Sequence, residues 1–183
     1  MIVKTIFAGF GGQGILLMGY ALATAAMTED KYVTFLPSYG AEVRGGTAHC
    51  TVSIADEEIA SPIASTLDYL VIMNAPSLSR FQSRVKRGGV CLVNSSLVHQ
   101  KCRRDDIRVY ELPVAEIAEE LGDIRVANMV MLGAFVKVSD LVKTETVIEV
   151  LPRIFSGKRQ EILAINREGI LRGHGAVRGE GNR

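Results

Sequence analysis

The stretch IVKTIFAGFGGQG, residues 2–14, decides the fold of this chain. Residues 2–8 are an apolar run rich in β-branched side chains, which predicts a buried strand, and the glycines that follow predict a tight turn. Residues 14–27 carry no charge and include many small side chains, which predicts a helix packed closely on a sheet. Residues 31–36 form a second expected strand. Strand, helix and strand in this order predict a βαβ unit with a right-handed crossover.

The rest of the chain continues this alternation. Further strands are expected at residues 48–54, 67–73, 90–93 and 107–112. The first of them alternates apolar and polar side chains and is therefore expected to be half-exposed. Further helices are expected at residues 76–85, 114–121, 126–138, 144–155 and 159–171. Pro152 is expected to kink or end the fourth of these.

This order of elements predicts an α/β fold of the three-layer α/β/α type, Rossmann-like, with a mostly parallel sheet. Residues 1–171 are expected to form a single domain. Residues 172–183 are rich in glycine and have few apolar side chains to hold them, so they are expected to be a disordered tail.

The composition is unusually apolar. The chain has 183 residues, of which 48% are hydrophobic and 22% are charged, and its mean hydropathy is +0.20. This indicates either burial against partner subunits or a parallel sheet sandwiched between buried helices, and the composition leaves both open. The net charge of +1 argues against a nucleic-acid partner. The short basic clusters at 84–87 and 101–104 are interpreted as solvated loop faces.

The cysteines and the apolar stretches bear on the cellular environment. Cys50, Cys91 and Cys102 are spaced too widely for a metal or iron–sulfur motif. Their odd number and the absence of a signal-peptide pattern predict a reducing, cytoplasmic environment. The uncharged stretch at residues 14–27 is shorter than the ~18–20 residues that span a bilayer, so no membrane association is expected.

The glycine-rich segment GFGGQG at 9–14 is the strongest local signal. Its glycines permit a tight turn, and the free N–H groups at the start of a helix attract phosphate or carboxylate. A dinucleotide fingerprint also needs Asp or Glu at the end of the second strand, where Leu36, Pro37 and Ser38 stand instead. A phosphate-bearing ligand other than NAD is therefore favoured. NAD itself, or glycines that only bring the helix against the sheet, remain the alternatives.

Small uncharged polar residues follow the expected strands, in the segments 9–14, 38–46, 74–77 and 94–96. Ligands of open parallel sheets bind at this edge. Arg44 is almost the only fixed charge there, so the edge suits a phosphate or carboxylate ligand better than catalysis. The residues expected to bind a cofactor are Gly9, Gly11, Gly12, Gln13, Gly14, Ser38, Tyr39, Arg44, Gly45 and Gly46. The polar residues of the last two segments are equally explained as ordinary loop caps.

Candidates for catalysis are few. His49 and Cys50 are neighbours on one expected strand and point to opposite faces, so they cannot form a nucleophile–base pair. Glu42 is placed to pair with Arg44 within the loop. No catalytic residue and no metal ligand is expected, and an enzyme that works unaided is not indicated.

Six segments carry a further signal: GFGGQG at 9–14, PSYGAEVRGGTAHCTVSI at 37–54, SP at 61–62, NAPS at 74–77, GGVCLVNSS at 88–96 and ANMVMLGAF at 127–135. Together they resemble the gamma subunit of 2-oxoacid:ferredoxin oxidoreductases, most closely of the 2-oxoglutarate type. The resemblance covers roughly residues 4–140, and its most specific part is PSYG…RGGT joined to GFGGQG. Ala41, Val43 and Ala75 depart from the commoner Pro, Met and Gln, which weakens only the choice of substrate.

This resemblance implies a gamma subunit that is not catalytic alone, in a complex with alpha and beta subunits and often a delta subunit. The complex would convert 2-oxoglutarate and coenzyme A to succinyl-CoA, CO₂ and reduced ferredoxin. Thiamine diphosphate and iron–sulfur clusters would be held by the other chains, so this chain would bind no cofactor by itself. The residues at 9–14 and 38–46 would then lie near the path of coenzyme A.

Several alternatives stay open. The substrate of the complex could be pyruvate, indolepyruvate or a branched-chain 2-oxoacid. The chain could instead be a free-standing nucleotide-binding protein, or a structural scaffold without ligand contact. An isolated chain could also pair with itself through the surface that the alpha subunit would cover.

Overall fold

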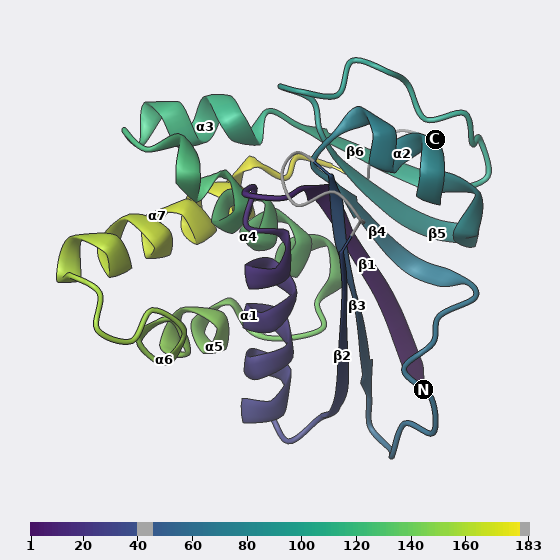
Figure 1. Ribbon diagram of the computed structural model, residues 1–183, viewed down its shortest axis with the longest axis horizontal. Coiled ribbons are helices and arrows are strands. Elements are labelled where there is room, and N and C mark those ends of the chain that lie inside the picture. The colour runs from purple at the N-terminus through teal and green to yellow at the C-terminus, as the bar shows by residue number, and fades with distance from the viewer. Residues whose placement is uncertain (40–45, 180–183) are drawn as a thin grey trace.

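The strands form one sheet in the order β2-β3-β1-β4-β5-β6, in a computed structural model that describes residues 1–39 and 46–179 (Figure 1). The strands are β1 (Ile2–Phe10), β2 (Tyr32–Tyr39), β3 (Thr47–Ala55), β4 (Leu67–Ile72), β5 (Val85–Asn94) and β6 (Arg108–Leu112). β1, β4, β5 and β6 pair in parallel, whereas β3 runs antiparallel to both of its neighbours, β1 and β2. All strands except β3 therefore point the same way, which confirms the mostly parallel sheet.

Strand β3 lies between the two strands of the predicted βαβ unit. β1 and β2 are parallel, as predicted, but they are not neighbours. Both faces of β3 are largely covered, since Thr51 is 7% exposed and Ser53 is fully buried. The expectation of a half-exposed strand at 48–54 was therefore wrong, because this segment is an interior strand between β2 and β1.

Strand β2 runs further than the sequence predicts. It continues through Pro37 to Tyr39, although residues 37–39 were expected to belong to a loop. β2 is an edge strand, and an edge strand tolerates proline because an outward-facing N–H has no ladder partner to lose. Ser38 and Tyr39 are thus held by pairing with β3, opposite His49 and Ala48.

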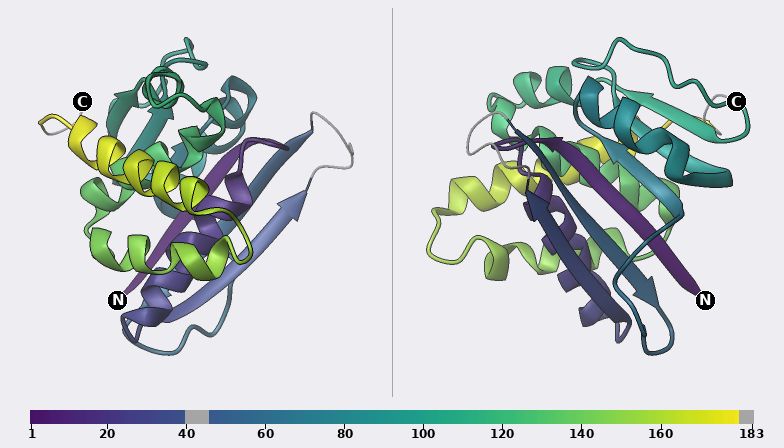
Figure 2. Two further views of the ribbon diagram at one scale, coloured as in Figure 1. Left: turned by 90° about the vertical axis from the view of Figure 1, so that its left-hand side faces the viewer. Right: turned by 45° about the vertical axis from the view of Figure 1, so that its right-hand side comes forward.

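Helices cover both faces of the sheet, which confirms the three-layer fold (Figures 1 and 2). The helices are α1 (Ile15–Thr28), α2 (Ala75–Phe81), α3 (Val114–Glu120), α4 (Ala127–Ser139), α5 (Thr144–Glu149), α6 (Leu151–Ile154) and α7 (Gln160–Ala176), with short 3₁₀ turns η1 (Gln82–Arg84) and η2 (Ile124–Val126). Within the described residues, none of these helices combines the length and apolar character that a membrane crossing requires.

The two faces are covered unequally. The larger core joins α1, α3, α4 and α5 to the sheet, and its centre is Phe135, whose ring meets Phe7 at 5.2 Å and Tyr69 at 5.5 Å, edge to face. The smaller core lies under α2, where Leu78 and Phe81 pack on the opposite face. Successive side chains of β1 point to opposite faces of the sheet, so Phe7 belongs to the larger core and its neighbour Ile6 to the smaller one.

Helix α7 packs against α4 through glycine and extends past the predicted end of the domain. It continues to Ala176, so residues 172–176, expected to belong to a disordered tail, are helical. Gly173 is buried because the backbone of Val130 in α4 passes directly over it. The missing side chain of Gly173 is thus what allows the contact, and this contact does not depend on the apolar side chains that residues 172–183 lack.

Pro152 divides the helix expected at 144–155 into two. α5 ends at Glu149, and α6 begins at Leu151 with Pro152 in its first turn. Proline is tolerated there because the first N–H groups of a helix have no intrahelical partner. The predicted interruption is confirmed.

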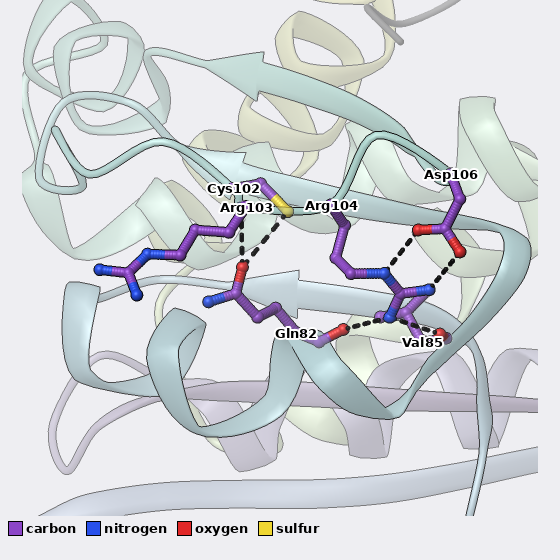
Figure 3. Close-up of polar contacts among 6 residues, drawn as sticks. All are labelled: Gln82, Val85, Cys102, Arg103, Arg104 and Asp106. Atoms are coloured by element: carbon purple, nitrogen blue, oxygen red, sulfur yellow. Dashed lines mark hydrogen bonds and ion pairs between the residues drawn. The ribbon is translucent and has the colours of Figure 1, made fainter.

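A network around Arg104 holds the long segment between β5 and β6 against the end of α2 (Figure 3). The Arg104 guanidinium donates to the backbone carbonyls of Gln82 and Val85, both at 3.1 Å, and to the Asp106 carboxylate at 2.5 and 2.7 Å. The pKa of Asp106 is lowered, chiefly by this hydrogen bond. Arg104 is therefore a packed side chain rather than part of a solvated loop face.

Candidate functional site

The carboxyl ends of β1 and β4 form the point where the chain reverses its direction across the sheet. After β1 the chain passes through α1 toward β2, whereas after β4 it passes through α2 to β5 on the other side. α1 and α2 lie on opposite faces of the sheet, since they belong to separate cores. Ligands of open α/β sheets bind in the crevice at such a switch point. The glycine-rich loop at 9–14 lies at this crevice.

Two glycines of this loop are required by close packing. Gly14 caps the start of α1 with φ of 72°, and a Cβ there would collide with the side chain of Asn128 in α4. A Cβ on Gly9 would lie 2.6 Å from Cδ1 of Ile15 and 2.9 Å from Cβ of Met73. These two glycines therefore bring helices against the sheet, which is the structural role that the sequence left open.

The side chain of Gln13 closes the loop from within. Its Oε1 accepts a hydrogen bond from the backbone N–H of Phe10 at 2.7 Å, and its Nε2 donates to the carbonyl of Met73 at 3.2 Å. Gln13 thus ties the end of β1 to the end of β4. Its side chain shapes the site, because both of its polar atoms are engaged inside the protein.

The structure brings the two predicted binding segments together. The backbone N–H of Gly11 donates to the carbonyl of Gly46 at 3.1 Å, which joins the loop after β1 to the residue before β3. Tyr39 lies opposite Ala48, which lies opposite Gly9, so Ser38 and Tyr39 stand at the same edge but two strands from the glycine loop. Of the predicted residues, Arg44 and Gly45 lie outside the described residues.

The strand order also bears on NAD binding. In the dinucleotide fold, the acidic residue that holds the ribose ends the strand adjacent to the first. Here β3 separates β2 from β1, and neighbouring strands lie about 4.7–4.9 Å apart, so the end of β2 is displaced by roughly twice that spacing. β2 ends in Ser38 and Tyr39, neither of which is acidic. Both facts disfavour NAD in its usual position.

A cavity of about 190 Å³ opens at the switch point. Its lining is Gly12, Gln13, Met73, Asn94, Leu97, Ala115, Ile124, Arg125, Ala127 and Asn128. A complete small molecule usually occupies ~300–1,000 Å³, so this cavity is sized for one group of a larger ligand. Leu97 and Ile124, each about half exposed, provide apolar walls at its rim.

Asn94 is the polar group of the cavity whose bonding is incomplete. Its side chain is fully buried, and Oδ1 accepts from the backbone N–H of Ser96 at 3.2 Å, as expected for a loop cap. Nδ2 has no partner among the described residues. A buried donor left without an acceptor costs about 1–3 kcal/mol, so a ligand oxygen in the cavity would recover this energy.

The α3–α4 region contributes residues that sequence reasoning missed. Asn128 and Arg125 line the cavity although they lie more than 100 residues from the glycine loop, and Asn128 Nδ2 donates weakly to the carbonyl of Gly14 at 3.4 Å. The sequence contains one indication of this role, because Asn128 is a polar residue within an almost entirely apolar buried helix. The side chain of Asn128 is 4% exposed, and a polar side chain that is buried to this degree normally has hydrogen-bond partners for its polar atoms.

The electrostatics of the cavity favour an anionic group. The first turn of α1 carries no acidic residue and has no side-chain cap, so its N–H groups and helix dipole are not offset there. Arg125 lies at the rim, but its positive charge is offset by an ion pair with the Asp123 carboxylate at 2.6 Å. The hydrogen bond from Arg125 lowers the pKa of Asp123.

The site holds donors rather than catalytic groups. Cys50 faces the larger core, where burial raises its pKa to about 12, whereas His49 faces Phe81 on the opposite side of the sheet. Their separation to opposite faces is confirmed. Within residues 1–39 and 46–179, no three His, Cys, Asp or Glu side chains are placed to hold a metal ion. The described geometry therefore suits binding of a phosphate or carboxylate.

Comparison with known sequences places this fold among oxidoreductases. Residues 4–176 match the family described as pyruvate ferredoxin/flavodoxin oxidoreductase. The chain is 39% identical over 165 residues to ketoisovalerate oxidoreductase subunit VorA of Methanothermobacter marburgensis, covering 90% of this chain and 34% of that one. It is 39% identical over 142 residues to 2-oxoglutarate synthase subunit KorC of Methanocaldococcus jannaschii, covering 76% of each. The chain thus spans about a third of the VorA relatives' length.

Solved structures agree with the sequence comparison. The gamma subunit of a keto/oxoacid ferredoxin oxidoreductase from Geobacter sulfurreducens is similar with a TM-score of 0.81 and 28% identity, over 95% of this chain and 97% of that one. The 2-oxoglutarate:ferredoxin oxidoreductase of Magnetococcus marinus, which contains 2-oxoglutarate, coenzyme A and succinyl-CoA, is similar with a TM-score of 0.88 and 25% identity, over 96% of this chain and 31% of that one.

Proposed function

Because this chain belongs to the pyruvate ferredoxin/flavodoxin oxidoreductase family, we propose that it is the gamma subunit of a 2-oxoacid:ferredoxin oxidoreductase. The observation that carries the proposal is the family match over residues 4–176, which includes every element of the fold except the first residues of β1. The Geobacter gamma subunit is similar to this chain over nearly the full length of both. Among residues 1–39 and 46–179, the site contains donors but no catalytic acid, base or nucleophile, which is consistent with a subunit that is not catalytic alone.

The partners we propose are the other subunits of such an oxidoreductase. VorA and the Magnetococcus enzyme contain a region similar to this chain as about a third of a longer polypeptide. We infer that alpha and beta subunits, in some complexes with a delta subunit, provide what the rest of those polypeptides provides. These chains would hold thiamine diphosphate, which supplies the decarboxylation chemistry, and the iron–sulfur clusters that pass electrons to ferredoxin.

The proposed substrate is 2-oxoglutarate, which the complex would convert with coenzyme A to succinyl-CoA, CO₂ and reduced ferredoxin. KorC supports this choice because it matches this chain as a separate subunit, over 76% of its own length. Ketoisovalerate is the second candidate, since the VorA match has the same 39% identity and covers more of this chain. Pyruvate and indolepyruvate are the remaining alternatives.

The proposed role of this subunit toward coenzyme A is to bind one of its anionic groups at the switch-point cavity. The fit is supported by the unpaired Nδ2 of Asn94, the uncapped start of α1 and the small volume, which suits a phosphate group and not the whole cofactor. Gln13 and Gly14 would hold the shape of the site. Arg44, in the predicted second segment, is proposed to add a charge-assisted contact.

The first experiment tests the assembly. The chain is purified from its native cells without oxygen, and the material is assayed for coenzyme-A-dependent dye reduction with 2-oxoglutarate, ketoisovalerate, pyruvate or indolepyruvate. We expect co-purifying partner chains and activity with one 2-oxoacid, which identifies the substrate. A lone chain without activity would contradict the proposal and direct attention to the free-standing nucleotide-binding alternative, which calorimetry with NAD and nucleotides would test.

The second experiment tests the cavity with a matched pair of variants. Asn94→Asp keeps the Oδ1 acceptor for Ser96 but replaces the unpaired donor by a negative charge, so the KM for coenzyme A in the assembled complex should rise about tenfold or more. Asn74→Asp is the control, because Asn74 also has an unpaired Nδ2 and caps α2 through Oδ1, but does not line the cavity.

Arg44→Ala in the same complex should raise the KM for coenzyme A or loosen the assembly. If neither changes, Arg44 is not part of the site. If Asn94→Asp and Asn74→Asp behave alike, the cavity is not the site, although the subunit assignment from the first experiment would still stand.

A further inference from the structure

A second cluster of donors lies on the α2 face of the sheet, apart from the switch-point cavity. Its centre is the buried ring of Phe81. The His49 ring lies 4.9 Å from it, and the guanidinium carbons of Arg80 and Arg84 lie 5.0 and 5.7 Å from it. Three nitrogen-bearing groups from α2, η1 and β3 thus surround one aromatic ring, although Arg84 was expected to point into solvent from a loop.

The two arginines have only neutral partners. Arg80 donates to the hydroxyl of Thr47 at 3.3 Å, and Arg84 donates to the backbone carbonyl of Ala64. Within the part of the chain that the structure describes, neither forms an ion pair. Arg104, Arg125 and Arg172, by contrast, each contact a carboxylate.

His49 completes the cluster as a neutral donor. Its Nδ1 is sealed from solvent and has no partner among the described residues, so a proton on that atom would be buried without an acceptor. The favoured tautomer therefore carries its proton on Nε2. Burial, and then the positive charges of Arg80 and Arg84, lower the pKa of His49 and keep the ring neutral.

We propose that Arg80, Arg84 and His49 form a binding site for an oxyanion, a phosphate or a carboxylate. Both guanidinium groups lie within 6 Å of the Phe81 ring centroid, and among the described residues neither has a carboxylate partner. The planar fork of a guanidinium matches the oxygens of either group. A neutral imidazole N–H adds a third donor without adding repulsion. This site is independent of the subunit assignment, because it rests on groups outside the switch-point cavity.

The position of the site indicates what kind of ligand reaches it. His49 pairs with Ala8 in β1 and Ser38 in β2, which lie two residues and one residue before the carboxyl ends of those strands, and Thr47 begins β3 at the same edge. The anion would therefore approach from the edge where the glycine loop lies, but on the other face of the sheet. It could belong to a phosphorylated small molecule or be a free dicarboxylate.

The test uses the isolated full chain and two probes, inorganic phosphate and succinate, at constant ionic strength. Binding is followed by the NMR shift of the His49 ring proton and by the rise in melting temperature that a ligand of the folded state causes. We expect a saturable shift with at least one probe. Arg80→Gln and Arg84→Gln should each weaken binding about tenfold.

Arg87→Gln is the matched control, because it removes the same charge from an exposed position that does not contact Phe81. Tighter binding of phosphate would identify a phosphorylated ligand, and tighter binding of succinate a carboxylate. No saturable shift with either probe would overturn the proposal, as would equal weakening by Arg87→Gln. Melting curves of each variant without ligand show whether it is folded, and Arg80→Lys, which keeps the charge, replaces any variant that is not.

Discussion

Gly14 is the single residue on which the start of α1 most depends. Its φ of 72° lies in the left-handed region, and a Cβ would collide with Asn128. Gly14→Ala should therefore lower the free energy of unfolding by roughly 3 kcal/mol, from backbone strain and overpacking together. Urea denaturation would show the change as a lower midpoint with an unchanged slope.

Gly12→Ala provides the control for this prediction. Gly12 also has a positive φ, 96°, but nothing lies within 4 Å of its missing Cβ. Only the strain of about 1–2 kcal/mol should then appear. An equal loss in both variants would mean that Asn128 does not constrain Gly14.

His49 should make the stability of the chain sensitive to acid. Its pKa in the folded state is below the ordinary value of 6.5, because of burial and the charges of Arg80 and Arg84. As the pH falls below about 6.5, the unfolded chain gains a proton that the folded chain does not, so stability is lost down to the folded pKa. His49→Gln should lose less stability than the unmodified chain between pH ~7.5 and ~5.5. A parallel decline of both proteins in urea denaturation would contradict this.

The three cysteines should differ in reactivity. Burial raises the pKa of Cys50 to about 12 and also raises that of Cys91, and both side chains are fully inaccessible. Because the thiolate is the reactive form, iodoacetamide should modify Cys102, which is partly exposed, well before the other two. Mass spectrometry of the native chain, against a sample unfolded in guanidinium, measures this order. Early modification of Cys50 would show that β3 opens locally.

Helices α4 and α7 are joined by glycines on both sides. A Cβ on Gly133 would collide with the backbone of Ile170, and one on Gly173 with the backbone of Val130. Either substitution to alanine should destabilise the fold by about 3 kcal/mol, because a backbone cannot yield as a side-chain tip can. The midpoint of urea denaturation measures the loss.

Gly175→Ala, in the same helix, is the matched control. Gly175 is exposed and nothing lies within 4 Å of its missing Cβ, so alanine should be neutral or stabilise α7 by up to about 1 kcal/mol. A loss at Gly175 comparable to that at Gly173 would indicate that helix propensity, and not the contact with α4, controls this region.

The molecule as a whole exposes apolar side chains at the carboxyl edge of the sheet. Leu97 and Ile124 are 52% and 50% exposed beside the cavity, and Tyr39 is 75% exposed at the end of β2. If this edge faces the other subunits, Ile124→Glu should prevent co-purification of the complex while leaving the isolated chain as stable, within about 0.5 kcal/mol.

Met27→Glu is the comparison for that prediction. Met27 is 65% exposed but lies near the end of α1, toward the opposite edge of the sheet. It should leave the assembly intact in gel filtration of the reconstituted complex. If Met27→Glu prevents assembly and Ile124→Glu does not, the interface with the other subunits lies on the outer side of α1.

Local patterns were sufficient to predict most elements and one half of the candidate site. The apolar run of β1, the glycines after it and the small residues of α1 act on their own neighbours, so their structure can be read without knowing the partners. Pro152 interrupted its helix, and the almost entirely apolar stretch at 126–138 proved to be a buried helix, for the same reason. The short motifs that resemble the gamma subunits are likewise contiguous in the sequence.

Only the tertiary structure decided where the strands pair and which residues meet. β3 enters between β1 and β2, and this pairing buries Thr51 and Ser53 and carries the end of β2 away from the glycine loop. Asn128 reaches Gly14 across 114 residues, and no local pattern encodes such a contact. Strand order and converging side chains depend on interactions between distant segments, whose energies appear only when the core that unites them has formed.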